Sequence, residues 1–337
     1  MDTAVVILNW NGQEMLRTYL PLLVERTAGC GAFIVVADNG STDGSVAWLQ
    51  ENWPSVRTLR FDRNYGFTGG YNRALREIDA DYYVLINSDV EVTEGWLAPL
   101  IGFMEDHPEV GVCQPKVRSV ADRDAFEYAG AAGGFIDRYG YPFCRGRILS
   151  NLEKDTGQYD SAEECFWATG ACMVVRSALY HHLGGLDEDF FAHMEEIDFC
   201  WRAKLLGYQV WCVPASTVFH VGGGTLPNNS PRKLYFNYRN NLLMLYKNLP
   251  DSIRWRRIFV RMCLDGASAA VYLVTGRWSY CKAVWKAHRD YRRMRRDEDP
   301  SPFAEERNNI GYYPRSIVLR FFLSRKKLVW SDIEQEL

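Results

Sequence analysis

The segment from Phe190 to Arg202 holds the densest group of side chains in the sequence that could perform chemistry. If a helix begins near Glu195, then Glu195, Asp198 and Arg202 share one face, and Glu196 points about 100° away from it. An Asp198–Arg202 ion pair would leave Glu196 free to accept a proton. Neighbouring aromatic residues would desolvate these carboxylates and raise their pKa. The alternative is that the acids only favour the positive end of the helix dipole.

Two further polar segments directly follow apolar runs. Asp38 precedes a Gly/Ser/Thr turn, where its carboxylate could accept a hydrogen bond from a nucleobase imide or a ribose hydroxyl. Alternatively, Asp38 or Asp43 only caps the next helix. Asp89 ends the segment Asn87-Ser88-Asp89, where its oxygens suit a hard divalent cation such as Mg²⁺ or Mn²⁺. An aspartate in an ordinary turn is the alternative reading of Asp89.

Two other segments could take part in ligand binding. Residues 66–72 open a helix with three glycines, which permits close approach of a phosphate or a sugar to the backbone. This segment lacks the Lys-Ser/Thr pair of a phosphate-binding loop. His220 precedes three consecutive glycines and could add a nitrogen ligand to a cation held by Asp89; a packed histidine is the alternative. No motif supports hydrolysis through a serine or cysteine nucleophile.

The elements that must position these residues follow an alternating pattern over the first ninety residues. Short β-branched runs alternate with amphipathic segments, which indicates parallel strands joined by helical crossovers. The predicted strands are 4–8, 33–37, 57–61 and 82–86, and the predicted helices are 13–26, 45–52, 69–78 and 96–106. Ligands bind at the carboxyl ends of strands in such a sheet, where the polar segments lie.

The later part of the chain changes character near residue 230. Glycine-rich segments at 130–134 and 139–146 indicate loops or hairpins. The predicted elements that follow are a strand at 171–175, a helix from 177, a helix from 195 and a strand at 209–213. From about Leu234 the pattern is helical and basic. We therefore expect an α/β catalytic domain at residues 1–230 and a mainly helical extension at residues 231–337.

The charge of the chain is unevenly distributed. Its 337 residues include 39 Lys and Arg and 42 Asp and Glu, for a net charge of −3, and its composition excludes disorder and collagen-like repeats. Residues 254–296, however, carry twelve Lys and Arg against two aspartates, with aromatic residues among them. This pattern indicates a helical surface that contacts a membrane. A nucleic-acid surface and a helix pair packed against the catalytic domain are the alternatives, and we expect no nucleic-acid partner.

Three features indicate a cytoplasmic protein. The apolar run at 4–8 follows Asp2 without a basic region or a cleavage site, which predicts a buried strand rather than a signal peptide. The nine cysteines are scattered and form no Cys-x-x-Cys pair, as in reduced proteins. The apolar stretch at 267–275 is far shorter than the roughly 20 residues of a spanning helix. We expect a peripheral protein at the cytoplasmic face of the membrane.

Taken in order, these segments resemble the family 2 glycosyltransferases, and among them the rhamnosyltransferase-like enzymes of bacterial polysaccharide assembly. Seven segments within about residues 3–248 carry the resemblance: Val6–Gly12, Asp38–Ser45, Asn64–Asn72, Leu85–Asp89, Ala168–Met173, Glu195–Arg202 and His220–Gly223. Tyr238-Arg239-Asn240 continues it. Each segment is short, but their ordered series is highly specific.

The resemblance implies a GT-A fold, a Rossmann-like mixed sheet flanked by helices. It also implies transfer of a sugar from a nucleotide donor, with inversion, to a hydroxyl of a glycan or a lipid-linked acceptor. Asp38 matches the acid that reads the base, and Arg239 could contact the diphosphate. The donor-binding residues implied are Asn9, Asn11, Gly12, Asp38, Asn39, Ser41, Asn64, Gly66, Phe67, Gly70, Asn72, Asn87, Ser88 and Arg239.

The metal ligands and the base are also implied by the resemblance. Asp89 matches the last acid of the family's metal motif, and His220 matches its late metal- or diphosphate-contacting histidine. Asn87 replaces the first acid of that motif, so the site would hold Mg²⁺ or Mn²⁺ less tightly. Glu196 aligns with the general base, usually an aspartate. Because a glutamate reaches further, Glu195 or Asp198 could share or take over this role.

Two other functions are compatible with parts of the pattern. A nucleotidyltransferase-like enzyme would use the same nucleotide pocket and metal carboxylate, but it would not need the acids at 195–198 and would release pyrophosphate. A catalytically inactive sugar-nucleotide-binding module is the other alternative, because Asn87 and Glu196 depart from the family pattern.

Overall fold

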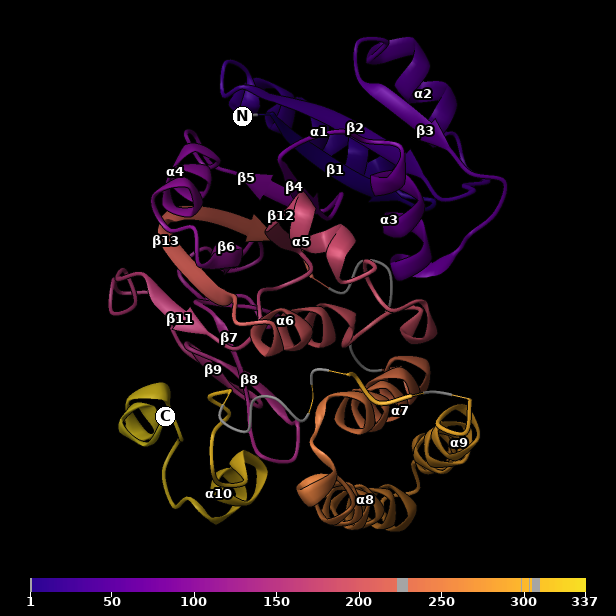
Figure 1. Ribbon diagram of the computed structural model, residues 1–337, viewed down its shortest axis with the longest axis vertical. Helices are drawn as coiled ribbons and strands as arrows, with labels where there is room; N and C mark the ends of the chain where they lie inside the picture. The colour runs from indigo at the N-terminus through magenta and orange to yellow at the C-terminus, as the bar shows by residue number, and fades with distance from the viewer. Residues whose placement is uncertain (1, 223–229, 298, 303, 305–309) are drawn as a thin grey trace.

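A mixed sheet of nine strands forms the centre of the computed structural model, which describes residues 2–222, 230–297, 299–302, 304 and 310–337 (Figure 1). The strands are β1 (Thr3–Asn9), β2 (Ala32–Asp38), β3 (Arg57–Arg60), β4 (Tyr82–Ile86), β5 (Val90–Val92), β6 (Val110–Ser119), β11 (Glu163–Cys165), β12 (Cys172–Arg176) and β13 (Gln209–His220). Their order is β11-β13-β6-β12-β4-β1-β2-β3, with β5 paired to β13. β1 lies parallel to β2 and β4, and β12 lies antiparallel to β4 and β6. The predicted α/β class is confirmed.

Helices cover both faces of this sheet, which is why its strands are apolar on both sides. Alternate residues of β1 enter different cores: Ala4 and Val6 face one, and Val5 and Ile7 face the other. The second core includes side chains of α1 (Gln13–Thr27), α2 (Ser45–Asn52) and α4 (Ala98–Asp106). The first core includes those of α3 (Gly66–Arg76), α5 (Ser177–His182), α6 (Glu195–Leu205) and α7 (Pro231–Asn248).

The central strand β6 was not predicted from the sequence. All but its last two residues are buried, yet it contains Pro115 and Lys116, which are unusual inside a strand. Lys116 is tolerated there because its Nζ lies 2.9 Å from a carboxylate oxygen of Asp155. Strand β13 is longer than predicted, since a register shift between Val213 and Thr217 interrupts its pattern. The same strand therefore continues to His220.

A small four-stranded sheet receives the end of the chain. It contains β7 (Gly134–Ile136), β8 (Pro142–Cys144), β9 (Arg147–Ile148) and β10 (Asn151–Leu152). The Tyr313 N–H donates to the carbonyl of Ile136 at 2.9 Å, and the Trp330 ring lies 4.5 Å from that of Phe135. This C-terminal segment includes α10 (Ile317–Leu323) and the short 3₁₀ turns η2 (Trp330–Asp332) and η3 (Glu334–Glu336). The chain end thus packs on the catalytic part.

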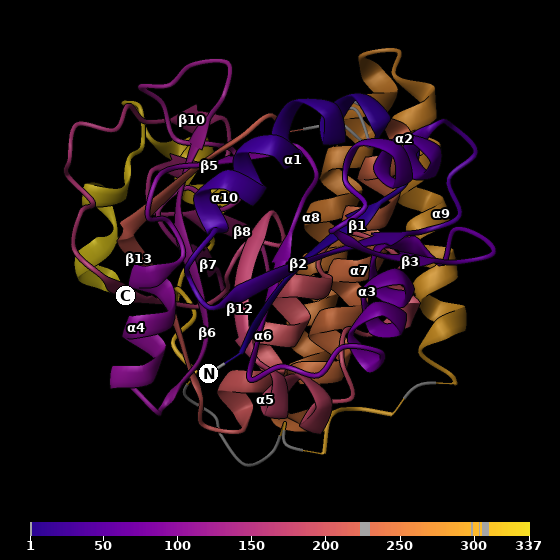
Figure 2. The same ribbon diagram turned by 90° about the horizontal axis from the view of Figure 1, so that it is seen from above.

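Helices α7, α8 (Asp251–Val274) and α9 (Trp278–Met294) lie together at one side of the molecule (Figures 1 and 2). Several of the basic residues predicted for a docking face instead hold these helices together. Arg261 Nε lies 2.8 Å from Asp265 Oδ1, and His288 Nε2 lies 3.1 Å from Asp265 Oδ2. Arg254 and Arg257 are also buried. Not every cation of residues 254–296 is therefore available to a docking surface, because these three arginines satisfy buried acceptors.

Candidate active site

The carboxyl ends of β1 and β2 carry the first cluster of predicted residues. Asn9 stands opposite Asp38 in the parallel register, and its amide donates to Asp38 Oδ1 at 2.9 Å and to Ser41 Oγ at 3.2 Å. The Ser41 N–H donates to Asp38 Oδ2 at 3.0 Å. These bonds fix the orientation of the Asp38 carboxylate at the edge of the sheet where ligands of such folds bind.

The loops after β1, β2 and β4 meet at the same edge. Asn11 adopts a left-handed conformation with φ of 50°, and its Oδ1 accepts a hydrogen bond from the Thr42 N–H at 2.7 Å. A Cβ added to Gly12 would lie 2.6 Å from Asn9 Oδ1 and 3.5 Å from Ser88 Oγ. Only glycine fits at position 12, because any side chain there would displace Asn9.

The helix-capping role falls to Asp43 rather than Asp38. Asp43 Oδ1 accepts a hydrogen bond from the Ser45 N–H at 3.0 Å, where α2 begins. Its Oδ2 accepts from the Gln13 N–H at 3.1 Å, where α1 begins. Asp43 thus satisfies orphan donors of two helices. The carboxylate of Asp38 therefore does not cap either helix.

Asn39 organises the second predicted segment. Its amide donates to Asn64 Oδ1 at 3.1 Å and to the Gly66 carbonyl at 2.9 Å. Gly66 has a φ of 76°, and a Cβ there would lie 2.6 Å from the Phe191 ring. The Phe67 N–H donates to the Phe191 carbonyl at 2.8 Å. The 64–67 loop therefore packs directly against the segment that precedes the acidic helix.

Two residues predicted to bind the donor have packing roles. A Cβ on Gly70 would lie 2.7 Å from Leu8 Cδ1, so this glycine lets α3 approach β1. The Asn72 amide donates to the Leu186 carbonyl at 2.7 Å, and its Oδ1 accepts from Tyr180 Oη at 2.7 Å. Asn72 is also buried. These contacts give Gly70 and Asn72 a packing role, and their binding to a donor stays a prediction.

Asp89 and His220, predicted as metal ligands, lie beside each other. His220 Nε2 is 3.2 Å from Asp89 Oδ1, and both side chains are largely buried. The other ring nitrogen, Nδ1, is 3.6 Å from Glu127 Oε2. Burial alone would lower the pKa of His220, but the bonds and charges of Asp89 and Glu127 outweigh it and raise this pKa to about 10.

This pair could offer a carboxylate and an imidazole to a divalent cation, which would displace the proton that His220 holds between Asp89 and Glu127. Carboxylate, imidazole and a second-shell carboxylate on the far ring nitrogen form the usual pattern for a metal-bound histidine. Among the described residues, however, no group of three or more His, Cys, Asp or Glu side chains could hold a metal ion. The Asn87 N–H donates to the Ala171 carbonyl at 3.0 Å. Gly223, at the end of the predicted histidine motif, lies outside the described residues.

The acids at the start of α6 differ in their partners. Asp198 is fully buried and accepts from Arg202 Nε at 2.7 Å and from the Asn248 amide at 2.7 Å. The predicted Asp198–Arg202 ion pair is confirmed. Within the part of the chain that the structure describes, no group donates a hydrogen bond to the buried Oε2 atoms of Glu195 and Glu196.

Burial sets the proton affinity of the two glutamates. Desolvation, with the charge of Glu196 added, raises the pKa of Glu195 well above its ordinary value. Desolvation also raises the pKa of Glu196, to about 7, against the opposing effect of backbone hydrogen bonds and the charge of Lys233. Glu196 is the more accessible of the two. A carboxylate in this state is matched to proton transfer near neutral pH.

The loop before α6 has an unusual backbone. Phe191, His193 and Met194 have φ values of 63°, 70° and 73°, a conformation that costs about 1 kcal/mol or more for each such residue. The Asn240 amide donates to three carbonyls of this loop, those of Phe190 at 3.0 Å, Ala192 at 2.9 Å and His193 at 2.6 Å. Asn240 is completely buried. It holds the strained loop in place and fixes where α6 begins.

Arg239 takes part in the same contact. Its Nη2 donates to the carbonyls of Asp189 and Phe190 at 2.8 and 2.9 Å. Its Nε donates to Asn240 Oδ1 at 2.8 Å. The guanidinium therefore holds the backbone before α6, and its contact with a diphosphate stays a prediction.

Gly170 lies between the segment of Glu196 and the segment of Asn87. A Cβ on Gly170 would lie 3.5 Å from Phe67 Cζ and 3.8 Å from Glu196 Cβ. The next residue, Ala171, accepts the hydrogen bond from Asn87 described above. Four predicted segments, those of Phe67, Asn87, Gly170 and Glu196, therefore meet here.

Sequence reasoning missed Glu127 and Asn240. Glu127 follows no strand with a recognisable pattern, and its role depends on pairing between β6 and β13, which brings its segment to His220. Asn240 stands in the Tyr238-Arg239-Asn240 motif, but the motif suggested a ligand contact for Arg239 only. Asn240 lies in the middle of α7, and no local pattern there predicts its contact with the loop before α6.

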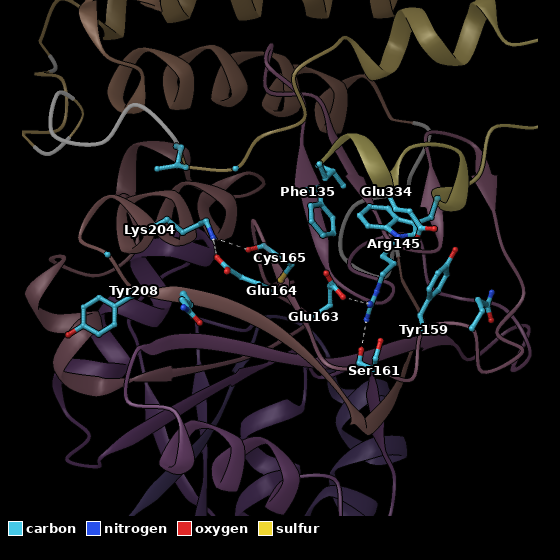
Figure 3. Close-up of a pocket in the computed structure, with 17 residues that line it drawn as sticks. Phe135, Arg145, Tyr159, Ser161, Glu163, Glu164, Cys165, Lys204, Tyr208 and Glu334 are labelled. Atoms are coloured by element: carbon cyan, nitrogen blue, oxygen red, sulfur yellow. Dashed lines mark hydrogen bonds and ion pairs between the residues drawn. The ribbon is translucent and has the colours of Figure 1, made fainter.

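A separate hollow lies at the other end of α6 and β13. Its volume is about 660 Å³, and it is lined by residues of β11, by Lys204 near the end of α6 and by C-terminal residues such as Trp330 (Figure 3). Its charged groups pair with one another: Arg145 Nη1 lies 3.2 Å from Glu163 and Lys204 Nζ lies 2.6 Å from Glu164. It contains none of the predicted site residues.

Comparison with known proteins agrees with this arrangement. A sequence model of the family described as Glycosyl transferase family 2 matches residues 4–184. An N-acetylglucosaminyl-diphospho-decaprenol L-rhamnosyltransferase of Mycobacterium tuberculosis is 28% identical over 76% of this chain and 86% of its own length.

Two solved structures share the fold. A mannosyltransferase of Pyrobaculum calidifontis in complex with GDP-Man and Mn²⁺ has a TM-score of 0.52 at 14% identity, with 85% of each chain covered. GalNAc-T7 with UDP, GalNAc and Mn²⁺ has a TM-score of 0.58 at 15% identity, over 74% of this chain and 48% of that one. The fold is GT-A, as predicted.

We predict that Asn240→Ala lowers kcat by about 100-fold, because the loop that places Glu196 loses its donor and a shift of about 1 Å is enough for such a loss. Binding of the nucleotide should change little. The matched control is Asn241→Ala, which removes an equally buried amide that bonds the Gly140 carbonyl instead. Similar kcat values in the two variants at equal stability would refute the positioning role of Asn240.

We predict that Glu196→Gln stabilises the protein above neutral pH. The unfolded glutamate ionises near 4.5, whereas the folded one keeps its proton up to about pH 7, so the wild-type carboxylate costs stability only as the pH rises through this interval. Denaturant unfolding should show a gain of about 2 kcal/mol for the variant at pH 8 and none at pH 4. Exposed Glu105→Gln serves as the control. An equal gain at both pH values would contradict the burial argument.

Proposed function

The chain belongs to glycosyl transferase family 2 and is a glycosyltransferase, and we propose that it transfers a sugar from a nucleoside diphosphate donor with inversion at the anomeric carbon. The observation that carries this proposal is the Glu196 carboxylate, whose Oε2 atom is buried without a hydrogen-bond partner among the described residues and which lies beside Gly170 and Phe67 at the edge of the sheet. Nucleotidyl transfer, the alternative considered from the sequence, would give no role to this carboxylate.

We infer the donor sugar and the acceptor from the relative in Mycobacterium tuberculosis. Its name describes transfer of L-rhamnose to N-acetylglucosaminyl-diphospho-decaprenol, and the alignment with it covers most of both chains. We propose that this chain likewise takes rhamnose from a nucleotide donor. The acceptor would be a sugar hydroxyl of a glycan or of a lipid-linked saccharide in cell-surface polysaccharide synthesis.

The donor pocket would lie between the β1, β2 and β4 loops. Asp38, oriented by Asn9 and Ser41, would accept hydrogen bonds from the base or ribose. Backbone at Asn11 and Gly12 would border the nucleotide, and Asn64, Gly66 and Phe67 would border the sugar. Asn39 acts by holding the 64–66 loop.

The proposed reaction is a single displacement. Glu196 takes the proton from the acceptor hydroxyl while the oxygen attacks the anomeric carbon, and the nucleoside diphosphate leaves with the electrons of the broken C–O bond. Base catalysis of this kind contributes about 10²- to 10⁴-fold. Glu195 is more buried than Glu196 and would keep its proton. It would therefore remain neutral and add no second negative charge beside Glu196.

Asp89 and His220 would hold Mg²⁺ or Mn²⁺, with Asn87 as a neutral oxygen donor nearby. When bound, such a cation neutralises negative charge on the departing diphosphate. Glu127 would keep the His220 ring oriented through its far nitrogen.

We also propose that the protein acts at the cytoplasmic face of the membrane as a peripheral protein. No helix among the described residues is long and apolar enough to span a bilayer. A lipid-linked acceptor would then be reached from the membrane surface.

We predict that Glu196→Gln abolishes transfer but keeps nucleoside diphosphate binding, as measured by calorimetry. In the wild type, kcat/KM should fall as the pH drops below about 7, because Glu196 gains its proton there rather than near 4.5. Glu196→Asp should keep measurable activity, and its kcat/KM should still fall as the pH is lowered. Glu105→Gln should behave as wild type. Wild-type turnover by Glu196→Gln would refute this assignment.

The most informative experiment incubates the protein with a panel of nucleotide sugars and acceptors, with and without Mn²⁺. We expect release of a nucleoside diphosphate from a rhamnose donor, dependent on the cation; release of pyrophosphate would contradict glycosyl transfer. Asp89→Asn and His220→Ala should each weaken Mn²⁺ binding, measured directly by electron paramagnetic resonance. Exposed His107→Ala is the control. Unchanged Mn²⁺ affinity in both variants would refute the assigned ligands.

A further inference from the structure

From Phe259 onwards, helix α8 has its charged residues on the inside and apolar residues on the outside. Between Phe259 and Val274 it contains only two charged residues, Arg261 and Asp265, and both are buried and paired with each other. The exposed positions of this stretch follow the helical period and are all uncharged: Phe259, Cys263, Gly266, Ala267, Ala270, Val271, Leu273 and Val274. This is the reverse of the usual surface helix, which turns its charges to water.

The exposed strip is long and contains large side chains. Phe259 is 69% exposed and Val274 is 83% exposed. Fifteen residues separate them, which corresponds to roughly 22 Å along a helix. Contiguous apolar surface of this size on a soluble protein marks a place of contact with a partner or a membrane.

Helix α10 shows the same inversion. Phe322 and Leu323 are 74% and 79% exposed, whereas the guanidinium of Arg320 turns inward to Tyr313 Oη and Glu336. Cations stand on both sides of this apolar tip: Arg315, Arg325, Lys326 and Lys327 are all exposed. Figure 1 shows α8 and α10 at the same end of the molecule, opposite the end that holds β3 and α2.

Helix α9 supplies a basic strip next to α8. Arg289, Arg292, Arg293 and Arg296 recur at helical spacing and are exposed, and with Trp285 and His288 they line a shallow hollow of about 420 Å³. Trp278, at the start of α9, is 68% exposed. Arginines that flank apolar and tryptophan side chains suit the boundary between lipid chains and phosphate headgroups.

We propose that the outer strip of α8 and the tip of α10 insert into the surface of an anionic bilayer, while the arginine strip of α9 contacts the lipid phosphates. This inference deepens the proposed function, since a lipid-linked acceptor would be reached from that surface. The occupant is a bilayer rather than a second copy of the chain, because the two apolar segments are bordered by cations and no acidic strip on α8, α9 or α10 complements them.

The test measures binding of the full chain to vesicles by co-sedimentation. Vesicles of phosphatidylcholine, with or without about 30% phosphatidylglycerol, serve as probes at low and high salt. Wild type should prefer the anionic vesicles. We expect V271E/V274E and F322E/L323E each to reduce the bound fraction about tenfold, because a charge is forced into the lipid boundary.

Two comparisons isolate the apolar and the basic contributions. R292E/R293E should abolish the preference for anionic lipid, and Phe33→Glu, an exposed apolar residue on β2, should have no effect. Lipids brominated on their chains should quench wild-type tryptophan fluorescence, and Trp278→Tyr should reduce this quenching. Nucleoside diphosphate release with a water-soluble acceptor should be unchanged in all these variants.

Three results would overturn the proposal. These are absence of wild-type binding to anionic vesicles, wild-type binding by both double variants of α8 and α10, and a dimer in sedimentation velocity that V271E/V274E dissociates without any vesicle binding. The last result would assign the strip to a second copy. If vesicles bind as expected but no nucleotide sugar is consumed, the proposed reaction fails and the docking surface stands.

Discussion

The position of the acidic helix α6 depends on hydrogen bonds from α7 to a backbone that would not hold its shape alone. Three residues just before α6 have positive φ, and the Asn240 amide and the Arg239 guanidinium together donate to the carbonyls of residues 189, 190, 192 and 193. The strain has a use, because the sharp turn lets Glu195 and Glu196 enter at the first turn of α6 and face the edge of the sheet. Helix α7 therefore helps to position α6, although it begins beyond residue 230.

The three carboxylates in the first turn of α6 have different partners and therefore different properties. Asp198 is neutralised by Arg202 and bound by Asn248, so it serves as an anchor between α6 and α7. Glu195 and Glu196 are desolvated without such partners, and their pKa values rise for that reason. The stability lost by burying unpaired carboxylates is what gives Glu196 a proton affinity suited to neutral pH. Stability and proton transfer are thus opposed at this position.

The sequence predicted most of the sheet and much of the site because both depend on local patterns. The strands at 82–86 and the helices at 45–52 and from 195 were placed correctly, and the i, i+4 spacing was sufficient to predict the Asp198–Arg202 pair. What the sequence did not reveal depends on contacts between distant segments. Gly70 and Asn72 stand in a ligand-like motif and also pack with Leu8, Tyr180 and Leu186, which no local pattern reveals. Strand β6 was missed because Lys116 is tolerated there through distant aspartates.

The same limit explains why the basic segment was read too simply. Counting Arg and Lys between residues 254 and 296 cannot tell which of them turn inward, and Arg254, Arg257 and Arg261 do. Their burial leaves the outer side of residues 259–274 without charge, since Arg254, Arg257 and Arg261 bond to the Leu249 carbonyl, Tyr312 and Asp265. The inward orientation of these arginines therefore explains both the charged inner side and the uncharged outer side of residues 259–274. Burial of Arg261 and Asp265 is tolerated because the two side chains pair with each other, and the uncharged exposed side chains of residues 259–274 form a surface of the kind that contacts a partner or a membrane.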